Sequence, residues 1–352
     1  MFLRNAWYVA AWDTEVTDAP LARMLLSEPV VLFRTQNGRA VALEDRCCHR
    51  QLPLSLGSVI EDELQCGYHG LRFDATGACV AVPGQIKVPP GAKVRSFPVV
   101  ERHGWIWIWM GDAARADAAL IPDWWWMDHP DWQVVRGNEG RPLHIKCHYE
   151  LITDNLLDLS HLSFVHADTI GAESILDYPA KTAREADGIK MTRLIPNEAP
   201  APLYKMAGDF EGNVDRWQIV EALVPGCCDV DVGSAEVGSG VLEGNRPQGI
   251  AFHALSAATP ETATSTHQFY AHPRMFSLDS DEMDDVYRVD FKRVFMEDVA
   301  MMEAQQVMLD RDPNRRQVDI NVDAPALAMR ALIAERIAAE NGSGHASGHA
   351  AP

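Results

Sequence analysis

Two short clusters of cysteine and histidine constrain this chain more than any other feature. They are Cys47-Cys48-His49-Arg50 and Cys66-Gly67-Tyr68-His69-Gly70, so the ligand pattern is C-x-H, sixteen residues, then C-x-x-H. Zinc accepts four such ligands, but zinc fingers usually place the two cysteines together and the two histidines together. A [2Fe–2S] cluster with both cysteines on one iron and both histidines on the other fits the mixed halves better. Unrelated buried residues in two loops are the remaining alternative.

The two clusters resemble the iron–sulfur motif of the Rieske non-haem iron oxygenases. Respiratory Rieske proteins carry an extra cysteine in each loop, whereas here Cys48 in the first loop has no counterpart in the second. Cys48 stands where members of the oxygenase family commonly have proline. The resemblance implies that Cys47 and Cys66 bind one iron of a Rieske [2Fe–2S] cluster, and that His49 and His69 bind the other.

Length, charge and cysteine content limit the class of protein. A chain of 352 residues can form two domains with separate cores. The formal net charge of -19 argues against partners such as nucleic acid or an anionic membrane. Seven cysteines, two of them expected as metal ligands, argue against a disulfide framework and favour a cytoplasmic location. The N-terminus lacks the basic start of a signal peptide, and no run of about 18 apolar residues is present to span a bilayer.

The first part of the chain is predicted to be rich in β-strands. Asn37-Gly38 separates two alternating runs and predicts a hairpin, and the apolar run 105–109 predicts a central strand. The composition then changes to an alanine-rich stretch followed by the tryptophan cluster 124–126, which we expect to pack at an interface. We therefore predict a Rieske domain over residues 1–112, a catalytic domain over 113–340 and a disordered tail over 341–352.

The second domain is predicted to combine an antiparallel sheet with a long helix. Alternating apolar runs lie between residues 175 and 275, whereas Cys227-Cys228 is interpreted as a turn with buried thiols. Residues 279–311 predict a helix with an apolar stripe made by Val286, Val289, Val294, Val299 and Met302. The fold class is therefore α+β, and the resemblance implies the helix-grip arrangement of the family's catalytic domain.

A second set of ligand-type residues lies in the stretch 150–166. Asp154, Asp158 and His161 are spaced to share one helical face. His166 lies five residues beyond His161, so we predict that the helix ends or distorts between the two histidines. Two histidines and a carboxylate from elsewhere in the chain would form the facial triad that leaves Fe(II) open positions.

The residues from Asp154 to His166 also resemble the catalytic-iron motif of the oxygenases, most closely that of the vanillate O-demethylase oxygenase subunits. The resemblance implies that His161 and His166 bind a mononuclear Fe(II). It gives Asp298 as the third ligand, and neighbouring Glu297 is the alternative.

In that family, two further residues of the motif have implied roles. The aspartate that corresponds to Asp158 bridges a Rieske histidine of a neighbouring subunit to a histidine on the catalytic iron, which implies a homotrimer. The asparagine that corresponds to Asn155 lies near the iron. A carboxylate between two ligating imidazoles orients both of them and tunes their basicity.

The chain contains no dinucleotide fingerprint and no phosphate-binding loop. We therefore expect electrons from a separate NAD(P)H-dependent reductase that carries flavin, iron–sulfur centres or both. The resemblance implies an oxygenase component that uses O2 to demethylate a vanillate-like methoxylated aromatic acid, which releases a phenol and formaldehyde.

Two alternatives and two substrate contacts remain to be tested. Another aromatic acid, such as a sulfonate, could be hydroxylated on its methyl group or ring. A pure electron-transfer Rieske protein is the other alternative, which the second ligand set opposes. Arg216 is a candidate partner for the substrate carboxylate, although Asp215 could neutralise it instead, and His253 is a candidate pocket residue.

Overall fold

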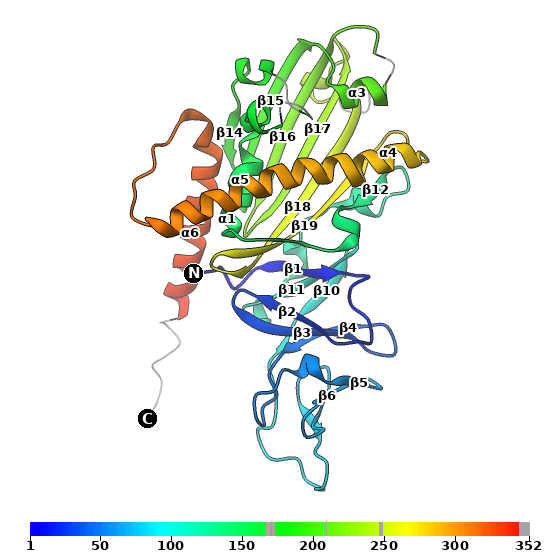
Figure 1. Cartoon of the computed structure of the whole chain (residues 1–352), viewed down its shortest axis with the longest axis vertical. Helices are drawn as coiled ribbons and strands as arrows, with labels where there is room; N and C mark the ends of the chain where they lie inside the picture. The colour runs from blue at the N-terminus through cyan, green and yellow to red at the C-terminus, as the bar shows by residue number, and fades with distance from the viewer. Residues whose placement is uncertain (167–169, 171–172, 209, 246–248, 345–352) are drawn as a thin grey trace. The chain divides into compact units, whose positions relative to one another are not determined.

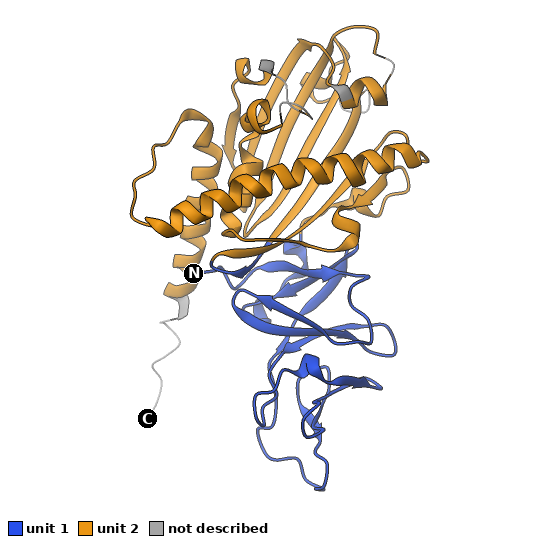
Figure 2. Cartoon of the chain, viewed as in Figure 1, with its two compact units in different colours: residues 1–121, 259–263 blue, residues 122–258, 264–352 orange. Residues whose placement is uncertain are grey.

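The computed structural model describes residues 1–166, 170, 173–208, 210–245 and 249–344. The chain divides into two compact units, of which the first comprises residues 1–121 with 259–263 and the second comprises 122–258 with 264–352 (Figure 2). The first unit therefore extends beyond the predicted boundary at residue 112, as far as Ile121. The tryptophan cluster 124–126 belongs to the second unit.

The first unit contains three small sheets. Their strand orders are β1-β11-β10, β2-β3-β4-β9 and β5-β6-β7-β8. The bounds are β1 Trp7–Trp12, β2 Leu21–Leu25, β3 Glu28–Arg34, β4 Ala40–Glu44, β5 Ser58–Ile60, β6 Glu63–Gln65, β7 Arg72–Phe73, β8 Cys79–Ala81, β9 Ser96–Phe97, β10 Val99–Arg102 and β11 Trp105–Trp109.

Two predictions for this unit are confirmed. Strands β3 and β4 pair antiparallel around the Asn37-Gly38 turn, where Gly38 has the positive φ of 83° that such a turn favours. Strand β11 lies between β1 and β10, and all five of its residues are buried. Burying each of its three tryptophans contributes roughly 1.5–3 kcal/mol, so β11 anchors the core of this sheet.

The second unit is built on one eight-stranded sheet in the order β12-β19-β18-β17-β16-β15-β14, with β13 also paired to β19. Its strands are β12 Gln133–Arg136, β13 Leu143–Ile145, β14 Lys181–Arg184, β15 Gly188–Glu198, β16 Val214–Leu223, β17 Cys227–Glu236, β18 Ile250–Thr262 and β19 Ser265–Arg274. The interpretation of Cys227-Cys228 as a turn is wrong, because both residues begin β17, although their thiols are buried as expected. The predicted α+β class with an antiparallel sheet is confirmed.

A long helix crosses one face of this sheet (Figure 1). The predicted helix 279–311 consists of α4 (Asp281–Asp285), a π-helical segment (Val286–Asp290) and α5 (Phe291–Arg311). The π-helical segment changes the phase of the side chains, so Val289 is 62% exposed and does not belong to the predicted stripe. Val294, Val299 and Met302 are buried as predicted.

The other α-helices of the described residues are α1 (Tyr149–Leu157), α2 (Leu162–Val165), α3 (Pro202–Ala207) and α6 (Ala324–Gly344). Helix α6 includes residues 341–344, which we expected to be disordered, and the rest of that predicted tail lies outside the described residues. Among the residues described, we find no helix with both the length and the hydropathy that a membrane crossing requires.

Candidate functional site

The four predicted cluster ligands lie on two loops of the first unit that have matching backbone geometry. The N–H of Cys47 donates to the carbonyl five residues ahead at 2.9 Å, and the N–H of Cys66 does the same at 2.8 Å. Each cysteine carbonyl then accepts from the N–H four residues ahead, that of Gln51 or Gly70. Both of those residues have positive φ, 61° and 73°. The backbone of each loop therefore turns in the same way around its cysteine ligand.

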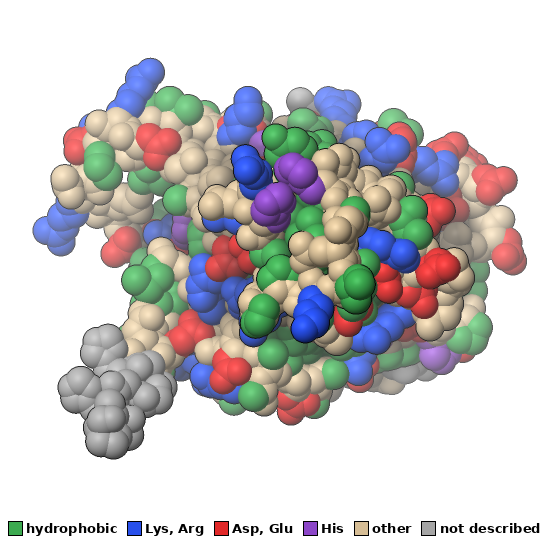
Figure 3. Space-filling model, turned by 90° about the horizontal axis from the view of Figure 1, so that it is seen from below, with side chains coloured by type: hydrophobic (Ala, Val, Ile, Leu, Met, Phe, Trp, Pro, Cys, Tyr) green, Lys and Arg blue, Asp and Glu red, His purple; other side chains and the backbone are tan. Residues whose placement is uncertain are grey.

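The donor atoms of these loops fit an iron–sulfur cluster of mixed ligation. Cys47 and Cys66 are each 2% exposed, whereas His49 and His69 are exposed, with ring centroids 4.6 Å apart. Histidine side chains lie together at the surface in the view from below, beside hydrophobic and basic side chains (Figure 3). Burial, with the neighbouring Cys66 thiol, raises the pKa of Cys47 to about 11, so at neutral pH it needs a bound metal to become a thiolate.

The second ligand set lies where helix α1 ends. The backbone at Asp158 (φ -111°, ψ 82°) leaves the helical region, and its carboxylate accepts from the Ser160 N–H at 2.9 Å. A 3-10 turn (Leu159–His161) and helix α2 follow, and α2 ends directly before His166. The prediction that Asp154, Asp158 and His161 share one helical face is wrong, since α1 ends before His161. The predicted helix end between the two histidines is confirmed, because α2 ends at Val165.

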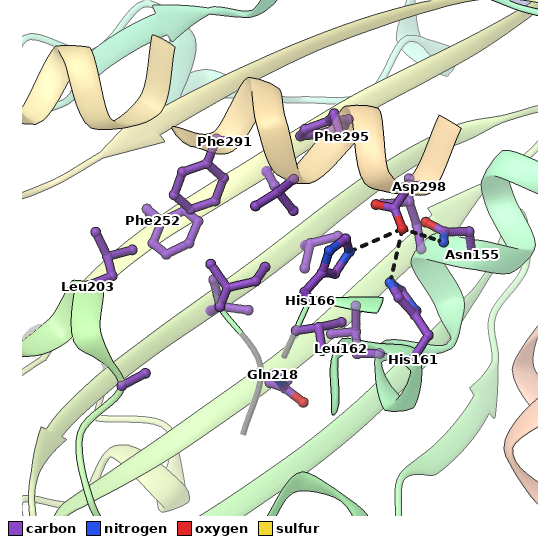
Figure 4. Close-up of a pocket in the computed structure, with 18 of the residues that line it drawn as sticks. Asn155, His161, Leu162, His166, Leu203, Gln218, Phe252, Phe291, Phe295 and Asp298 are labelled. Atoms are coloured by element: carbon purple, nitrogen blue, oxygen red, sulfur yellow. Dashed lines mark hydrogen bonds and ion pairs between the residues drawn. The ribbon is translucent and has the colours of Figure 1, made fainter. Parts of the chain in front are cut away.

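His161 and His166 converge with Asp298, which reaches them from α5 (Figure 4). The Asp298 Oδ1 lies 3.4 Å from His161 Nε2 and 3.1 Å from His166 Nε2. One ligand atom from each residue lies within 4.8 Å of those of the other two. Two imidazoles and a carboxylate at these separations are the donor set of a 2-His-1-carboxylate iron site.

Further contacts orient each of these three side chains. The outer nitrogen of His166, Nδ1, bonds to Glu297 Oε2 at 2.8 Å, and His161 Nδ1 bonds to the backbone carbonyl of Asp158. Because that carbonyl can only accept, His161 carries a proton on Nδ1 and presents Nε2 to Asp298. The Asn155 amide donates to Asp298 Oδ1 at 3.0 Å. Glu297, the alternative ligand, therefore lies on the outer side of His166 and not at the convergence point.

The electrostatics of the set favour a bound cation. Burial alone would raise the pKa of Asp298, but hydrogen bonds from His161 and His166 lower it to about 2. Burial would also lower the pKa of His166, but the hydrogen bonds and negative charges of Asp298 and Glu297 raise it above its ordinary value. The site thus holds an ionised carboxylate and stabilises positive charge beside it, which a metal ion can supply in place of a proton.

A pocket of about 120 Å³ adjoins the His161–His166–Asp298 set. Its floor is one face of the sheet, because alternate residues of each strand point toward it. Phe252, Phe291 and Phe295 give it apolar walls (Figure 4). Its polar lining away from the ligand set includes Arg216 and Gln218 of β16.

Arg216 lines this pocket and is only 5% exposed. Its guanidinium lies 5.6 Å from the centre of the Tyr204 ring, and we find no hydrogen bond or ion pair to it within the described part of the chain. Asp215, the alternative partner, points to the other side of β16 and accepts from the backbone N–H groups of Asn197 and Gly238, both at 2.9 Å. Arg216 is therefore a buried cation without a counter-charge from the described protein residues.

The structure places His253 on the opposite face of the sheet from the pocket. Its neighbours Phe252 and Ala254 line the pocket, so the alternation along β18 turns His253 away. Its ring stacks on Trp126 at 3.9 Å, and its Nδ1 bonds to Asp229 at 2.7 Å. His253 is thus part of a packed aromatic cluster, a position that the strand alternation could have indicated.

A second pocket of about 690 Å³ lies on the outer side of the ligand set. Asn155, His161 and Met302 line both pockets, whereas Asp158 and Arg330 line only the outer one. The residues of the candidate iron site therefore separate an apolar inner pocket from a more polar outer one.

Sequence reasoning missed two buried glutamines of the inner pocket, Gln218 and Gln268. Gln218 lies two residues after Arg216 in the same strand, a spacing that indicates a shared face. Gln268 carries no comparable signal, because its placement depends on the register of β19 within the sheet.

Comparisons with known proteins agree with this geometry. Residues 6–98 match the Rieske [2Fe-2S] domain, and residues 145–339 match the vanillate O-demethylase oxygenase C-terminal domain. The chain is 44% identical to the putative toluene-4-sulfonate monooxygenase system iron-sulfur subunit of Comamonas testosteroni, with 97% of this chain and 99% of that protein covered. It is 38% identical to the vanillate O-demethylase oxygenase subunit of a Pseudomonas strain, with 97% and 96% covered.

A solved structure of dicamba monooxygenase with non-heme iron and dicamba has the same architecture. The TM-score is 0.84 at 32% identity, over 97% of this chain and 99% of that one. The fold and the two donor sets define a Rieske non-haem iron oxygenase, and the chain belongs to this family. Within the family it is the oxygenase component of an aromatic monooxygenase, with a Rieske [2Fe–2S] cluster and a mononuclear iron as cofactors. The predicted resemblance, fold and cofactors are confirmed.

Proposed function

We propose that this oxygenase removes the methyl group of a methoxylated aromatic acid, with vanillate or a similar methoxybenzoate as the substrate. One observation carries the proposal: the buried, unpaired Arg216 lines an apolar pocket that also contains the His161–His166–Asp298 set. A buried guanidinium is stabilised by a bidentate carboxylate, and the apolar walls suit a flat ring.

Arg216 and the metal ligands lie toward different ends of this pocket. Arg216 lies over Tyr204, which packs in one cluster with Phe252 and Phe291. Asp298 is seven residues further along α5, which corresponds to about 10 Å of helix. An aromatic acid held by its carboxylate at Arg216 would therefore direct a substituent of the far side of its ring toward the metal site.

We assign Cys47, His49, Cys66 and His69 to the cluster, and His161, His166 and Asp298 to the mononuclear iron. Iron bound there would supply the activation of O2. The amide of Asn155 holds Asp298 in position, and the phenylalanine walls exclude water from the ring. In the overall reaction, ArOCH3, O2, two electrons and two protons give ArOCH2OH and water, and the hemiacetal then collapses to a phenol and formaldehyde.

Electrons are proposed to come from a separate NAD(P)H-dependent reductase. Asp158 lines the outer pocket, and its backbone carbonyl already bonds to His161. We assign to Asp158 the link between the two centres: its carbonyl holds the His161 imidazole, and its carboxylate would meet a cluster histidine of a neighbouring subunit in a homotrimer. This assignment supports a path for electrons that enters the iron site from its outer side.

Hydroxylation of the methyl group of an aromatic sulfonate is the second candidate. It is favoured by the 44% identity to a protein named for toluene-4-sulfonate. A sulfonate presents the same negative charge to Arg216, so the two reactions differ in the group that lies near the iron.

Product analysis separates the two candidates. Purified enzyme with a reductase, NADH and O2 is supplied with methoxybenzoates that include vanillate, and separately with 4-methylbenzenesulfonate. Formaldehyde equal to the O2 consumed with one methoxybenzoate is the expected result. A hydroxymethyl sulfonate formed without any formaldehyde from the methoxybenzoates would replace the first candidate with the second.

The role of Arg216 has its own test. Arg216→Met should raise the KM for the accepted acid about 10–100-fold, because a charge-assisted hydrogen bond contributes about 1.5–3 kcal/mol. Arg184→Met is the control, since this arginine of β14 bonds to Glu335 and does not line the pocket. An unchanged KM in Arg216→Met would remove the anion-binding role.

A further inference from the structure

The side chain of Gln268 has an unused hydrogen-bond acceptor in the inner pocket. Gln268 is 2% exposed and lines the pocket from strand β19. Its amide nitrogen donates to Ser256 Oγ at 3.0 Å, while its Oε1 is buried and has no hydrogen-bond partner among the described residues. Buried carbonyl oxygens are rarely left unsatisfied, so this atom points to a donor that the ligand brings.

Gln268 lies toward the metal end of the pocket. Strand β19 and helix α5 run in opposite directions, because the His272 ring contacts Phe291 at 4.9 Å and the Tyr270 ring stacks on Phe295 at 4.1 Å. The next residue of β19 on that face is Gln268. It therefore lies beneath the turn of α5 that follows Phe295 and carries the metal-binding carboxylate.

Arg216 and Gln218, which line the pocket from one face of β16, have the opposite hydrogen-bonding character to Gln268 Oε1. Gln218 Oε1 already accepts from Arg193 Nη1 at 3.0 Å, so what Gln218 can offer to a ligand is its N–H group. Arg216 also offers only donors. The pocket thus presents donors where an anion would bind and an acceptor near the site of attack.

We propose that Gln268 is a specificity-determining residue that accepts a hydrogen bond from a hydroxyl group on the substrate ring, beside the group that is attacked. The substrate class is then a phenolic aromatic acid in which the hydroxyl lies next to the methoxyl, as in 4-hydroxy-3-methoxybenzoate. A toluenesulfonate has no such donor and leaves Gln268 Oε1 unpaired. This inference rests on the proposed function for the identity of the attacked group.

Binding of a matched pair of ligands tests the role of Gln268 without turnover. Dissociation constants of the metal-loaded enzyme for 4-hydroxy-3-methoxybenzoate and for 3-methoxybenzoate are measured by calorimetry in the absence of O2. The native enzyme should prefer the hydroxylated acid by about 10-fold or more, since a site with a buried acceptor discriminates against a ligand that leaves it unpaired. In Gln268→Met, which keeps the side-chain length, the ratio of the two constants should fall to near one.

Two further variants control for structural effects. Gln218→Met changes the other buried glutamine of the pocket, so it should weaken the binding of both acids and preserve their ratio. Ser256→Ala removes the contact that fixes the Gln268 amide, so it should lower the ratio even if Gln268→Met fails to fold. Retention of the mononuclear iron, whose donor set lies in the same unit, reports that each variant is folded.

Each outcome decides the proposal. An equal affinity of the native enzyme for both acids, or a preference that survives in both Gln268→Met and Ser256→Ala, overturns it. A collapsed ratio in Gln268→Met with a preserved ratio in Gln218→Met supports it. Tight, Gln268-dependent binding without formaldehyde release in the turnover assay would overturn the O-demethylation and leave the role of Gln268 standing, so the two failures are distinguishable.

Discussion

The two metal sites differ in how the chain brings their ligands together. The cluster ligands lie within residues 47–69, on two loops that close with the same hydrogen bonds. The ligands of the mononuclear site lie at 161, 166 and 298, and they meet because α5 packs over the sheet of the second unit. The first site depends on local backbone geometry, whereas the second depends on tertiary packing. The two sites should therefore respond independently to substitution.

The largest effect is expected from removing a cluster ligand. Cys66→Ser should abolish the visible absorption of the cluster and all reductase-driven turnover, because the mononuclear iron then receives no electrons. About one iron per chain should remain, since the other donor set is in a separate unit. Loss of all iron from this variant would contradict the independence of the two sites.

Asp158→Asn tests the connection between the sites. The asparagine oxygen can still cap the Ser160 N–H, so both metals should be retained. Turnover should fall about 10–100-fold, the usual effect of losing a partner of a metal-bound histidine. Ser160→Ala serves as the control, because it removes one contact of the Asp158 carboxylate and leaves its charge. Full turnover by Asp158→Asn would eliminate the bridging role.

A smaller effect is expected from Glu297, which bonds to the outer nitrogen of His166 and not to the other two proposed ligands. Glu297→Gln keeps a hydrogen-bond acceptor but removes the charge, so the affinity for mononuclear iron should fall by about 10-fold. Competition with a chelator measures this affinity. Glu303→Gln on the same helix is the matched control, because Glu303 accepts from the Lys146 backbone N–H and touches no proposed ligand. A greater iron loss in Glu303→Gln than in Glu297→Gln would refute the assignment.

The smallest effect concerns stability alone. Arg330 of α6 pairs with Asp154 of α1, with one contact at 2.9 Å, and both side chains are partly buried. Arg330→Met should lower the free energy of unfolding of the second unit by about 1–3 kcal/mol, without changing the cluster spectrum. Arg336→Met removes the more exposed pair with Asp187 and should cost only about 0–1 kcal/mol. Equal losses in urea denaturation of the two variants would show that burial of the pair does not matter.

The comparison of the two sites also explains how much could be predicted from the sequence. Cluster ligands that are near one another in the chain, and a hairpin marked by Asn37-Gly38, depend on local geometry and were predicted from the residues. His161 and His166 meet a carboxylate that lies 132 residues beyond His166. Nothing in the sequence near the histidines indicates this partner. It was reached through the resemblance to a family.

The errors in the prediction also concern features that depend on tertiary packing and not on local sequence. A π-helical segment displaced Val289 from the apolar stripe, and α6 was not predicted at all. His253 was expected in the pocket, but its side chain points to the other face of β18. Gln268 was not expected there, but the register of β19 places it in the pocket lining. Each of these outcomes depends on the phase of an element relative to its neighbours, which composition and spacing alone do not determine.

Iron analysis of the native enzyme and of Asp298→Ala tests the central claim most directly. With a two-iron cluster and a separate mononuclear site, the native chain should hold about three irons. Asp298→Ala should hold about two, with unchanged cluster absorption and no substrate oxidation. A native chain with only two irons, or a variant that loses its cluster absorption together with the third iron, would contradict the account of two independently assembled metal sites.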